Sequence, residues 1–236
     1  MRVLYIFPHP DDESFGPARA MAAQRRQGHA IYLLTLTRGE ATRVRHTFGW
    51  SLEQMGEARY REMLAVKEVL DLADMRVLTL PDGGLEELDP RTIERLIREE
   101  ILRVQPHVVV TFPVHGISGF RDHLVTHATV KRVYVELHTP DRPWLQRLAF
   151  FTVDVAPSGF PWHVTVSKPE QIDCILHVTD ADMDQYHRAL DCYVTYQGVI
   201  AETRVHQFFD THVPFELFRE NHEPPLADLC AGLNPM

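Results

Sequence analysis

The sequence predicts an α/β protein with a largely parallel β-sheet. Short apolar segments typical of buried strands alternate with longer segments of helical periodicity through the first two thirds of the chain. Successive parallel strands need crossover connections, which place helices on both faces of the sheet. The last third is less regular, and the sequence shows no convincing interdomain linker. We therefore expect one domain over 1–236, with a core at 1–140 and a mixed elaboration at 141–236.

The first half of the chain contains three expected strands and two expected helices. The strands are rich in apolar and β-branched residues and are predicted at residues 2–7, 30–37 and 76–80. A helix is expected over 14–27 because Gly28 is a natural helix terminator. A second is expected over 51–72, where apolar residues recur at helical spacing.

The same alternation continues after a turn at 81–84. A helix over 90–104 and a strand over 107–112 are predicted, followed by a glycine-containing loop at 113–121 and a helix over 122–138. The remaining candidates are strands at 147–153, 162–166 and 173–178 and a helix over 180–195.

Bulk composition narrows the class of protein. The formal net charge of −9 argues against general affinity for nucleic acid or for an anionic membrane. Cys174, Cys192 and Cys230 show neither a disulfide framework nor a thiolate metal motif, which fits a reducing compartment. The chain begins with a strand-like pattern instead of a leader, and no stretch is apolar enough to span a bilayer. We therefore expect a cytoplasmic protein.

A metal-ligand nitrogen and three carboxylates follow the first predicted strand, in the run Pro8-His9-Pro10-Asp11-Asp12-Glu13. In an open α/β sheet the loops after the strand ends face the ligand crevice. Carboxylates this close repel one another when all are ionised. A bound cation is the simplest way to hold them together, and imidazole is a common zinc ligand.

A second candidate loop follows the strand at 107–112 and ends in Asp122-His123. Both loops leave the same edge of a parallel sheet, so we expect His9, Asp12 and His123 to converge. Two imidazoles and one carboxylate form a three-ligand zinc site with room for water. Asp11 remains beside this site and could take a proton from that water, because zinc lowers the pKa of the bound water towards ~7. His127, one helical turn after His123, is a further candidate.

These motifs resemble those of the PIG-L/LmbE-like de-N-acetylases. The first family motif matches residues 9–13, and the second, usually His-Pro-Asp-His, corresponds to residues 120–123. Weaker similarity extends over about two thirds of the chain, at residues 37–40, 59–62, 80–83, 116–119 and 196–197.

The resemblance implies a Rossmann-like, three-layer fold and a metal-dependent hydrolase. The family's divalent metal, usually zinc, would be bound by His9, Asp12 and His123, with Fe²⁺ or another divalent ion as an alternative. Asp11 is assigned as the general base, in agreement with the independent reasoning from the loop. The implied substrate is a small molecule that carries an N-acetyl or other N-acyl amino sugar.

The resemblance also suggests substrate-binding residues and a quaternary structure. Glu40, Arg59 and Asp82 fall where the family places groups that contact the sugar or line the site. Arg59 could instead pair with Glu62 on a helix face, and Asp82 could be only a turn residue. Members of the family frequently form homo-oligomers, so the chain is a candidate homo-oligomer.

One position departs from the family pattern. The first histidine of the second motif, which helps to stabilise the tetrahedral oxyanion, is Phe120 here. A phenyl ring cannot donate that hydrogen bond, and loss of one oxyanion donor can cost ~10²–10³ in rate. Arg121, His115 or His206 could supply a replacement donor, or the metal alone could polarise the carbonyl.

Three alternatives remain open at this point. Two histidines and one carboxylate also satisfy the facial triad of a non-haem iron oxygenase, although that chemistry commonly uses a β-barrel. The loss of the donor at Phe120 would suit a metal-binding homologue with a regulatory or binding role and weak catalysis. The same hydrolase chemistry could also cleave a different amide.

Overall fold

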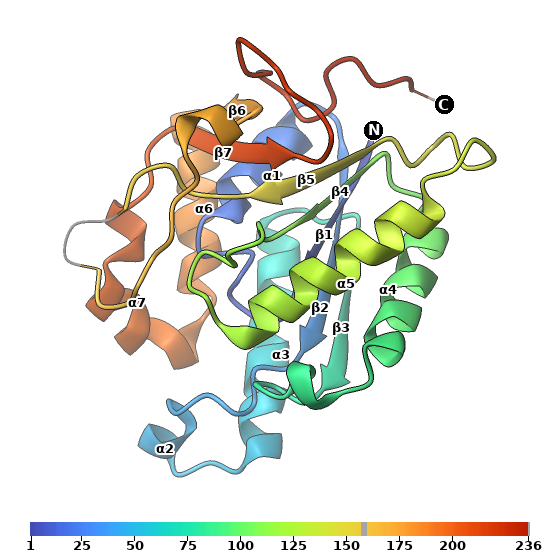
Figure 1. The fold of residues 1–236 in the computed structure, drawn as a ribbon. Helices are drawn as coiled ribbons and strands as arrows, with labels where there is room; N and C mark the ends of the chain where they lie inside the picture. Colours follow the sequence, from blue (N-terminus) through green and yellow to red (C-terminus); the bar gives the residue numbers. More distant parts are fainter. Residues whose placement is uncertain (157–159, 236) are drawn as a thin grey trace.

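The computed structural model describes residues 1–156 and 160–235, which form one seven-stranded sheet with helices on both faces (Figure 1). The strand order is β3-β2-β1-β4-β5-β7-β6. The strands are β1 (Arg2–Phe7), β2 (Ala30–Thr37), β3 (Asp74–Leu80), β4 (Val108–Thr111), β5 (Arg147–Phe151), β6 (Cys174–His177) and β7 (His212–Leu217). The first five in chain order run parallel, which confirms the predicted fold class.

Helices cover the two faces of the sheet in separate groups. One face carries α4 and α5, which pack against each other, and the other carries α1, α3 and α6 (Figure 1). The helices are α1 (Pro17–Arg26), α2 (Arg45–Phe48), α3 (Leu52–Val69), α4 (Pro90–Val104), α5 (Arg121–Leu137), α6 (Asp180–Asp191) and α7 (Gln197–Thr203). Short 3₁₀ helices lie at η1 (Leu85–Glu87), η2 (Pro169–Gln171), η3 (Val194–Tyr196) and η4 (Val205–Gln207).

The central strand β1 has an apolar residue at each inward position of both faces. Val3, Tyr5 and Phe7 belong to the core beneath α1, α3 and α6, while Leu4 and Ile6 belong to the core beneath α4 and α5. Side chains alternate between faces along a strand, so a continuous apolar run is required where both faces are covered. This double burial fixes β1 in the centre of the sheet and thereby fixes the loop that follows it.

The last third of the chain extends the same sheet with antiparallel strands. β7 pairs antiparallel with β5, and β6 pairs antiparallel with β7. The predicted strand at 162–166 is wrong, because that segment is irregular and the Thr165 N–H donates to the Ile117 carbonyl in a loop. Because β5 belongs to the parallel part, the sheet continues across residue 140, and the division of the domain there stays a prediction.

The first helix begins later than predicted. Residues 11–16 form turns, and α1 starts only at Pro17, a residue suited to the first helical turn. Its end agrees with the prediction, since Gly28 follows with a φ of 88°. The extra turns keep the polar run after β1 at the sheet edge instead of drawing it into a helix.

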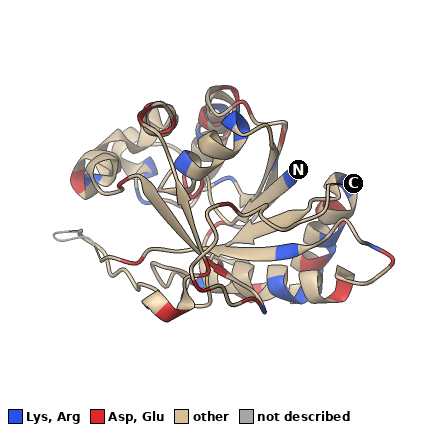
Figure 2. Cartoon of the chain, turned by 90° about the horizontal axis from the view of Figure 1, so that it is seen from above, with Lys and Arg blue, Asp and Glu red and all other residues tan. Residues whose placement is uncertain are grey.

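Charged groups of both signs are interspersed over the molecule. Figure 2 shows Lys and Arg distributed over helices and strands among Asp and Glu. Within the described residues, no helix combines the length and apolar character needed to cross a membrane.

Candidate metal centre

The loop after β1 holds its own carboxylate and imidazole in contact. The backbone N–H of His9 donates to Oδ2 of Asp12 at 2.8 Å, and His9 Nδ1 lies 3.4 Å from the same oxygen. Between them Asp11 adopts a positive φ of 84°, an uncommon conformation for a residue with a side chain. Asp11 and Asp12 therefore both lie in the turns before α1 and not in the helix itself.

His123 reaches the loop from the first turn of α5. Its Nδ1 lies 2.9 Å from the carbonyl oxygen of Gly116 and must donate to it, so Nε2 carries a free electron pair. Nε2 is buried, 3.3 Å from Oδ1 of Asp12, and has no hydrogen-bond partner within the described part of the chain. A buried, unpartnered acceptor beside a carboxylate is the arrangement a cation would satisfy.

Gly116 sets the position of His123 and gives a direct prediction. Its φ is 65°, and a Cβ added there would lie 2.9 Å from Cβ of His123. We expect Gly116→Ala to displace the imidazole and weaken zinc binding, with a loss of about 1–3 kcal/mol in the free energy of unfolding. Zinc titration and thermal unfolding would measure both effects.

Gly119 supplies the matched control in the same loop. Its φ is 72°, but a Cβ there meets nothing within 4 Å. Gly119→Ala should therefore show the cost of backbone strain without the clash against His123. Equal loss of zinc affinity in both variants would contradict the role assigned to Gly116.

The structure brings together the three predicted ligands. His9, Asp12 and His123 each offer a ligand atom, and these atoms lie within 4.8 Å of one another. Two imidazole nitrogens and a carboxylate oxygen suit zinc and related divalent ions. His127 does not belong to this group: its Nδ1 lies 2.9 Å from the Phe112 carbonyl and its ring packs against Phe150.

A second group on the other side of His9 orients the imidazole. His9 Nε2 lies 3.2 Å from Asp122 Oδ2 and 3.4 Å from Asp82 Oδ1. The Asp122 carboxylate also accepts hydrogen bonds from the backbone N–H groups of Gly83 and Leu85. Asp122 is not the N-cap of α5, a position that Phe120 occupies. Its oxygens are already engaged, so Asp122 holds the Nε2–H of His9 and leaves Nδ1 to face Asp12.

The close carboxylates and imidazoles shift the pKa values of His9 and Asp12. Burial alone would lower the pKa of His9, but the carboxylates of Asp12, Asp122 and Asp82 raise it to about 10. Burial alone would raise the pKa of Asp12, but His123 and His9 hold it well below its usual range. The carboxylates that favour the proton on His9 would equally favour a metal cation that takes the place of that proton.

Asp11 is held by a buried arginine from α3. Arg59 donates from Nη2 to Asp11 Oδ2 at 2.8 Å and to the Pro10 carbonyl at 2.7 Å, and it packs 3.8 Å above the Tyr196 ring. Burial raises the pKa of Asp11 to about 6, against the lowering effect of Arg59. Arg59 is 1% exposed, so its contacts in this structure are with the protein, and a substrate contact stays a prediction.

Sequence reasoning missed Tyr193, which secures the same loop. Its hydroxyl accepts from the Asp11 N–H at 2.8 Å and donates to Glu13 Oε1 at 2.6 Å. Burial raises the pKa of Glu13 to about 7, although Tyr193 and Ser14 oppose that shift. The only sequence signal was the nearby Tyr196-Gln197 similarity, because Tyr193 is separated from Asp11 by 182 residues.

Glu40 and Asp82 tie two neighbouring loops to each other. Oε1 of Glu40 accepts from the Asp82 N–H at 3.1 Å, and Oδ2 of Asp82 accepts from the Ala41 N–H at 2.7 Å. Oε2 of Glu40 is buried without a hydrogen-bond partner among the described residues. Asp82 is placed beside His9, and the roles of both residues in substrate binding remain predictions.

Three residues were candidates to replace the hydrogen-bond donor that is lost at Phe120, and the structure places each of them in contacts outside the metal group. Arg121 pairs with Glu86 at the surface. The two ring nitrogens of His115 interact with the Ile117 N–H and with Ser167 Oγ. His206 lines a cavity of about 290 Å³ between α6 and the segment after it. None of these observed contacts is with Asp11, Asp12 or His123.

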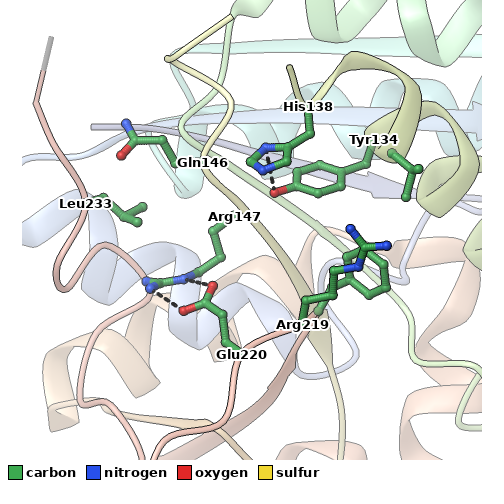
Figure 3. Close-up of a pocket in the computed structure, with 9 residues that line it drawn as sticks. Tyr134, His138, Gln146, Arg147, Arg219, Glu220 and Leu233 are labelled. Carbon is green, nitrogen blue, oxygen red and sulfur yellow. Dashed lines mark hydrogen bonds and ion pairs between the residues drawn. The ribbon is translucent and has the colours of Figure 1, made fainter. Parts of the chain in front are cut away.

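A second cavity, of about 280 Å³, lies at the other end of α5 from His123 (Figure 3). Its walls include Tyr134, His138 and Arg147, and Arg147 forms a two-pronged ion pair with Glu220. The predicted metal ligands do not line this cavity, so the candidate site remains the group of polar residues at the strand ends.

The PIG-L family, described as GlcNAc-PI de-N-acetylase, matches residues 4–134, which is more than half of the chain. The chain therefore belongs to this family. The match contains the whole metal group and Asp11, and it confirms the resemblance seen in the motifs.

Curated relatives carry related names. The chain is 31% identical over 161 residues to a 1D-myo-inositol 2-acetamido-2-deoxy-alpha-D-glucopyranoside deacetylase of Kineococcus radiotolerans, covering 57% of this chain and 45% of that protein. It is 34% identical over 143 residues to a probable N-acetyl-alpha-D-glucosaminyl L-malate deacetylase 2 of Bacillus subtilis, covering 60% and 64%. The chain thus spans about half to two thirds of the length of these relatives.

Solved structures confirm the fold. A deacetylase from the teicoplanin biosynthesis pathway superposes with a TM-score of 0.72 at 16% identity, covering 94% of this chain and all of that one. A 4-carboxy-2-hydroxymuconate hydratase from Pseudomonas putida gives 0.68 at 16% identity, covering 94% and 97%. Because a deacetylase and a hydratase share this fold, the fold alone does not identify the reaction of this chain, which has to be inferred from the residues of the metal group.

Proposed function

We propose that this protein is a zinc-dependent hydrolase that removes an N-acetyl or other N-acyl group from a small molecule containing an amino sugar. The observation that carries the proposal is the group of His9, Asp12 and His123, whose ligand atoms lie within 4.8 Å of one another, in a loop where the adjacent acid Asp11 is held by Arg59. The names of the two curated relatives support the amino-sugar substrate. The α/β sheet disfavours the iron oxygenase alternative.

The chain's own residues divide the proposed work between binding and proton transfer. A divalent cation held by His9, Asp12 and His123 would supply a Lewis acid and lower the pKa of water. Oδ2 of Asp11 is engaged by Arg59, so Oδ1 is the atom that takes the proton of the attacking water. The same oxygen then delivers that proton to the departing amine, which releases the carboxylate and a free amino sugar.

Arg59 has a positioning role in this proposal, and Arg59→Lys tests it. A lysine ammonium cannot reproduce the planar guanidinium that meets Asp11 and Pro10 while stacking on Tyr196. We expect kcat to fall by roughly 10–100-fold, the effect of misplacing a catalytic group, with KM changed little. Steady-state kinetics would measure the split. Arg61→Lys, an exposed position on the same helix, is the matched control.

An Arg59→Lys variant that keeps the full kcat would contradict the positioning role of Arg59. A rise in KM at unchanged kcat would instead support the alternative that Arg59 contacts the substrate. We also propose Glu40 and Asp82 as substrate-contacting residues, since both lie in the loops that meet beside His9. Cytoplasmic localisation and homo-oligomer formation stay predictions.

The proposed activity is tested by measuring carboxylate release. Protein stripped of metal and reloaded with one equivalent of zinc would be incubated with a panel of N-acetyl and N-acyl amino sugars. We expect acetate or the longer carboxylate together with an equal amount of free amine, and loss of both products after chelation. Oxygen consumption without carboxylate release in iron-loaded protein would favour the oxygenase, and zinc binding without any product would favour the binding homologue.

A further inference from the structure

A second group of metal-ligating side chains lies at the opposite end of the sheet from the candidate metal centre. His29, Asp228 and Cys230 each offer a ligand atom, and these atoms lie within 4.8 Å of one another. His29 directly precedes β2, whereas the loop after β1 accepts a hydrogen bond from Thr37, the last residue of β2. The 8 residues of β2 therefore separate the two groups by roughly 25 Å. Both chain termini lie at the His29 end of the sheet (Figure 1).

The spacing of His29 and Asp228 suits two ligands of one cation better than it suits a hydrogen bond. Nε2 of His29 lies 3.9 Å from Oδ2 of Asp228, which is beyond hydrogen-bond range. Two ligands at zinc-bond lengths are roughly 3.3–3.8 Å apart when the geometry is tetrahedral. Oδ1 of Asp228 accepts from the Cys230 N–H at 2.9 Å, so the carboxylate presents its other oxygen to His29.

The segment that carries Asp228 and Cys230 is anchored by a buried arginine. Arg147 is 4% exposed and donates from Nη1 to the carbonyl oxygens of Leu229 and Ala231, the residues on either side of Cys230. Cys230 is itself buried, whereas the side chain of Asp228 is 33% exposed. The fold therefore holds the ligands in place and leaves a cation a route from solvent.

The three donor types indicate a cation of the zinc class. Thiolate and imidazole bind Zn²⁺ well, whereas Mg²⁺ and Ca²⁺ prefer a shell of oxygen atoms. Burial raises the pKa of the Cys230 thiol to about 12, so the cation has to displace the thiol proton. Binding at Nε2 of His29 also places the ring proton on Nδ1, which lies 3.3 Å from the Met1 nitrogen. The cation thus replaces the thiol proton and one proton of the His29–Met1 pair.

We propose that His29, Asp228 and Cys230 bind a zinc ion of their own, which ties the segment around Cys230 to the start of β2. Three protein ligands leave one tetrahedral position to water. The site shares no residue with the candidate metal centre, so it stands independently of the proposed hydrolysis. Its ligands lie far apart in the sequence, which is why the spacing of the cysteines shows no metal motif.

Cobalt distinguishes this site from the candidate metal centre, because of the two groups only this one contains sulfur. Co²⁺ takes the place of zinc in such sites, and a cobalt–thiolate bond gives a charge-transfer band in the near ultraviolet that imidazole and carboxylate ligands do not give. Metal-free protein would be titrated with cobalt chloride and its absorption recorded. The same titration would be run on His123→Ala, Cys230→Ser, Cys192→Ser and His29→Gln.

We expect the charge-transfer band in the unsubstituted protein and also in His123→Ala, where it should saturate at one equivalent of cobalt. Cys230→Ser should abolish the band, and Cys192→Ser, at a cysteine outside both groups, should leave it intact. His29→Gln should weaken cobalt binding by at least roughly tenfold, and this variant tests the site even where loss of the buried Cys230 thiol disturbs folding. Absence of the band from the unsubstituted protein, its survival in Cys230→Ser or unchanged affinity in His29→Gln would overturn the site.

Discussion

Replacement of Asp11 by Asn is expected to abolish turnover while the protein keeps its zinc. Asparagine has nearly the shape of aspartate and its carbonyl oxygen can still accept from Arg59 Nη2, so the loop geometry should persist. The amide cannot take up the proton of the attacking water. We expect kcat to fall by roughly 10²–10⁴-fold, the usual contribution of a positioned general base. Carboxylate-release kinetics and zinc content would be measured on the same sample.

The combination of these two measurements decides the role of Asp11. A variant without activity and without zinc would mean that Asp11 supports the metal group instead of moving the proton. Full activity in a zinc-loaded variant would contradict its assignment as general base. Asp191→Asn, in the last turn of α6 and exposed, serves as the control for a change of one carboxylate at the surface.

Removal of His123 is expected to eliminate both zinc at the metal centre and activity. His123→Ala deletes the unpartnered Nε2 and leaves a single imidazole and Asp12, which is too few ligands for a stable zinc site. We expect zinc affinity to fall by at least about 100-fold, more than the effect of losing an outer-shell partner. Competition with a zinc chromophore would measure the affinity, and carboxylate release the activity.

His127 provides a control that separates metal binding from packing. It lies one turn further along α5, is also buried and also bonds a backbone carbonyl, but it does not belong to the metal group. His127→Ala should lower the free energy of unfolding by an amount similar to His123→Ala, roughly 1–3 kcal/mol, because each removes a buried ring and its hydrogen bond to a backbone carbonyl. Its zinc affinity should stay unchanged. Equal loss of zinc in both variants would contradict the ligand assignment.

The central part of the fold could be predicted because its signals are local. The apolar run of β1 is unbroken since both of its faces are buried, and Gly28 ends α1 as expected. The parallel alternation then placed residues 9–12 and His123 at one sheet edge. Convergence of the three ligands followed from topology and needed no knowledge of side-chain packing.

Other elements could not be read from local patterns. A strand was predicted at residues 162–166, but the Thr165 N–H donates to a loop carbonyl and not to a neighbouring strand. β7 contains Pro214, a residue that ordinarily argues against a strand inside a sheet, yet β7 lies between β5 and β6. Its place in the sheet is decided by tertiary pairing.

The supporting contacts of the site were hidden for a related reason. Tyr193 meets Asp11 and Glu13 across the fold, and Asp122 bonds the loop that contains Gly83 instead of capping its own helix. Such contacts join segments far apart in the sequence, so only the folded chain reveals them. The ligands are set by motif and topology, whereas their orientation is set by long-range hydrogen bonds.

The most direct test of the metal centre is an anomalous difference map at the zinc edge from a crystal of the zinc-loaded protein. We expect one peak bonded to His9, Asp12 and His123 at about 2.0–2.2 Å, with Asp11 close to it and not coordinated. Zinc peaks only elsewhere, or zinc-loaded active protein with no density between these three side chains, would contradict the assignment of these residues as the metal ligands.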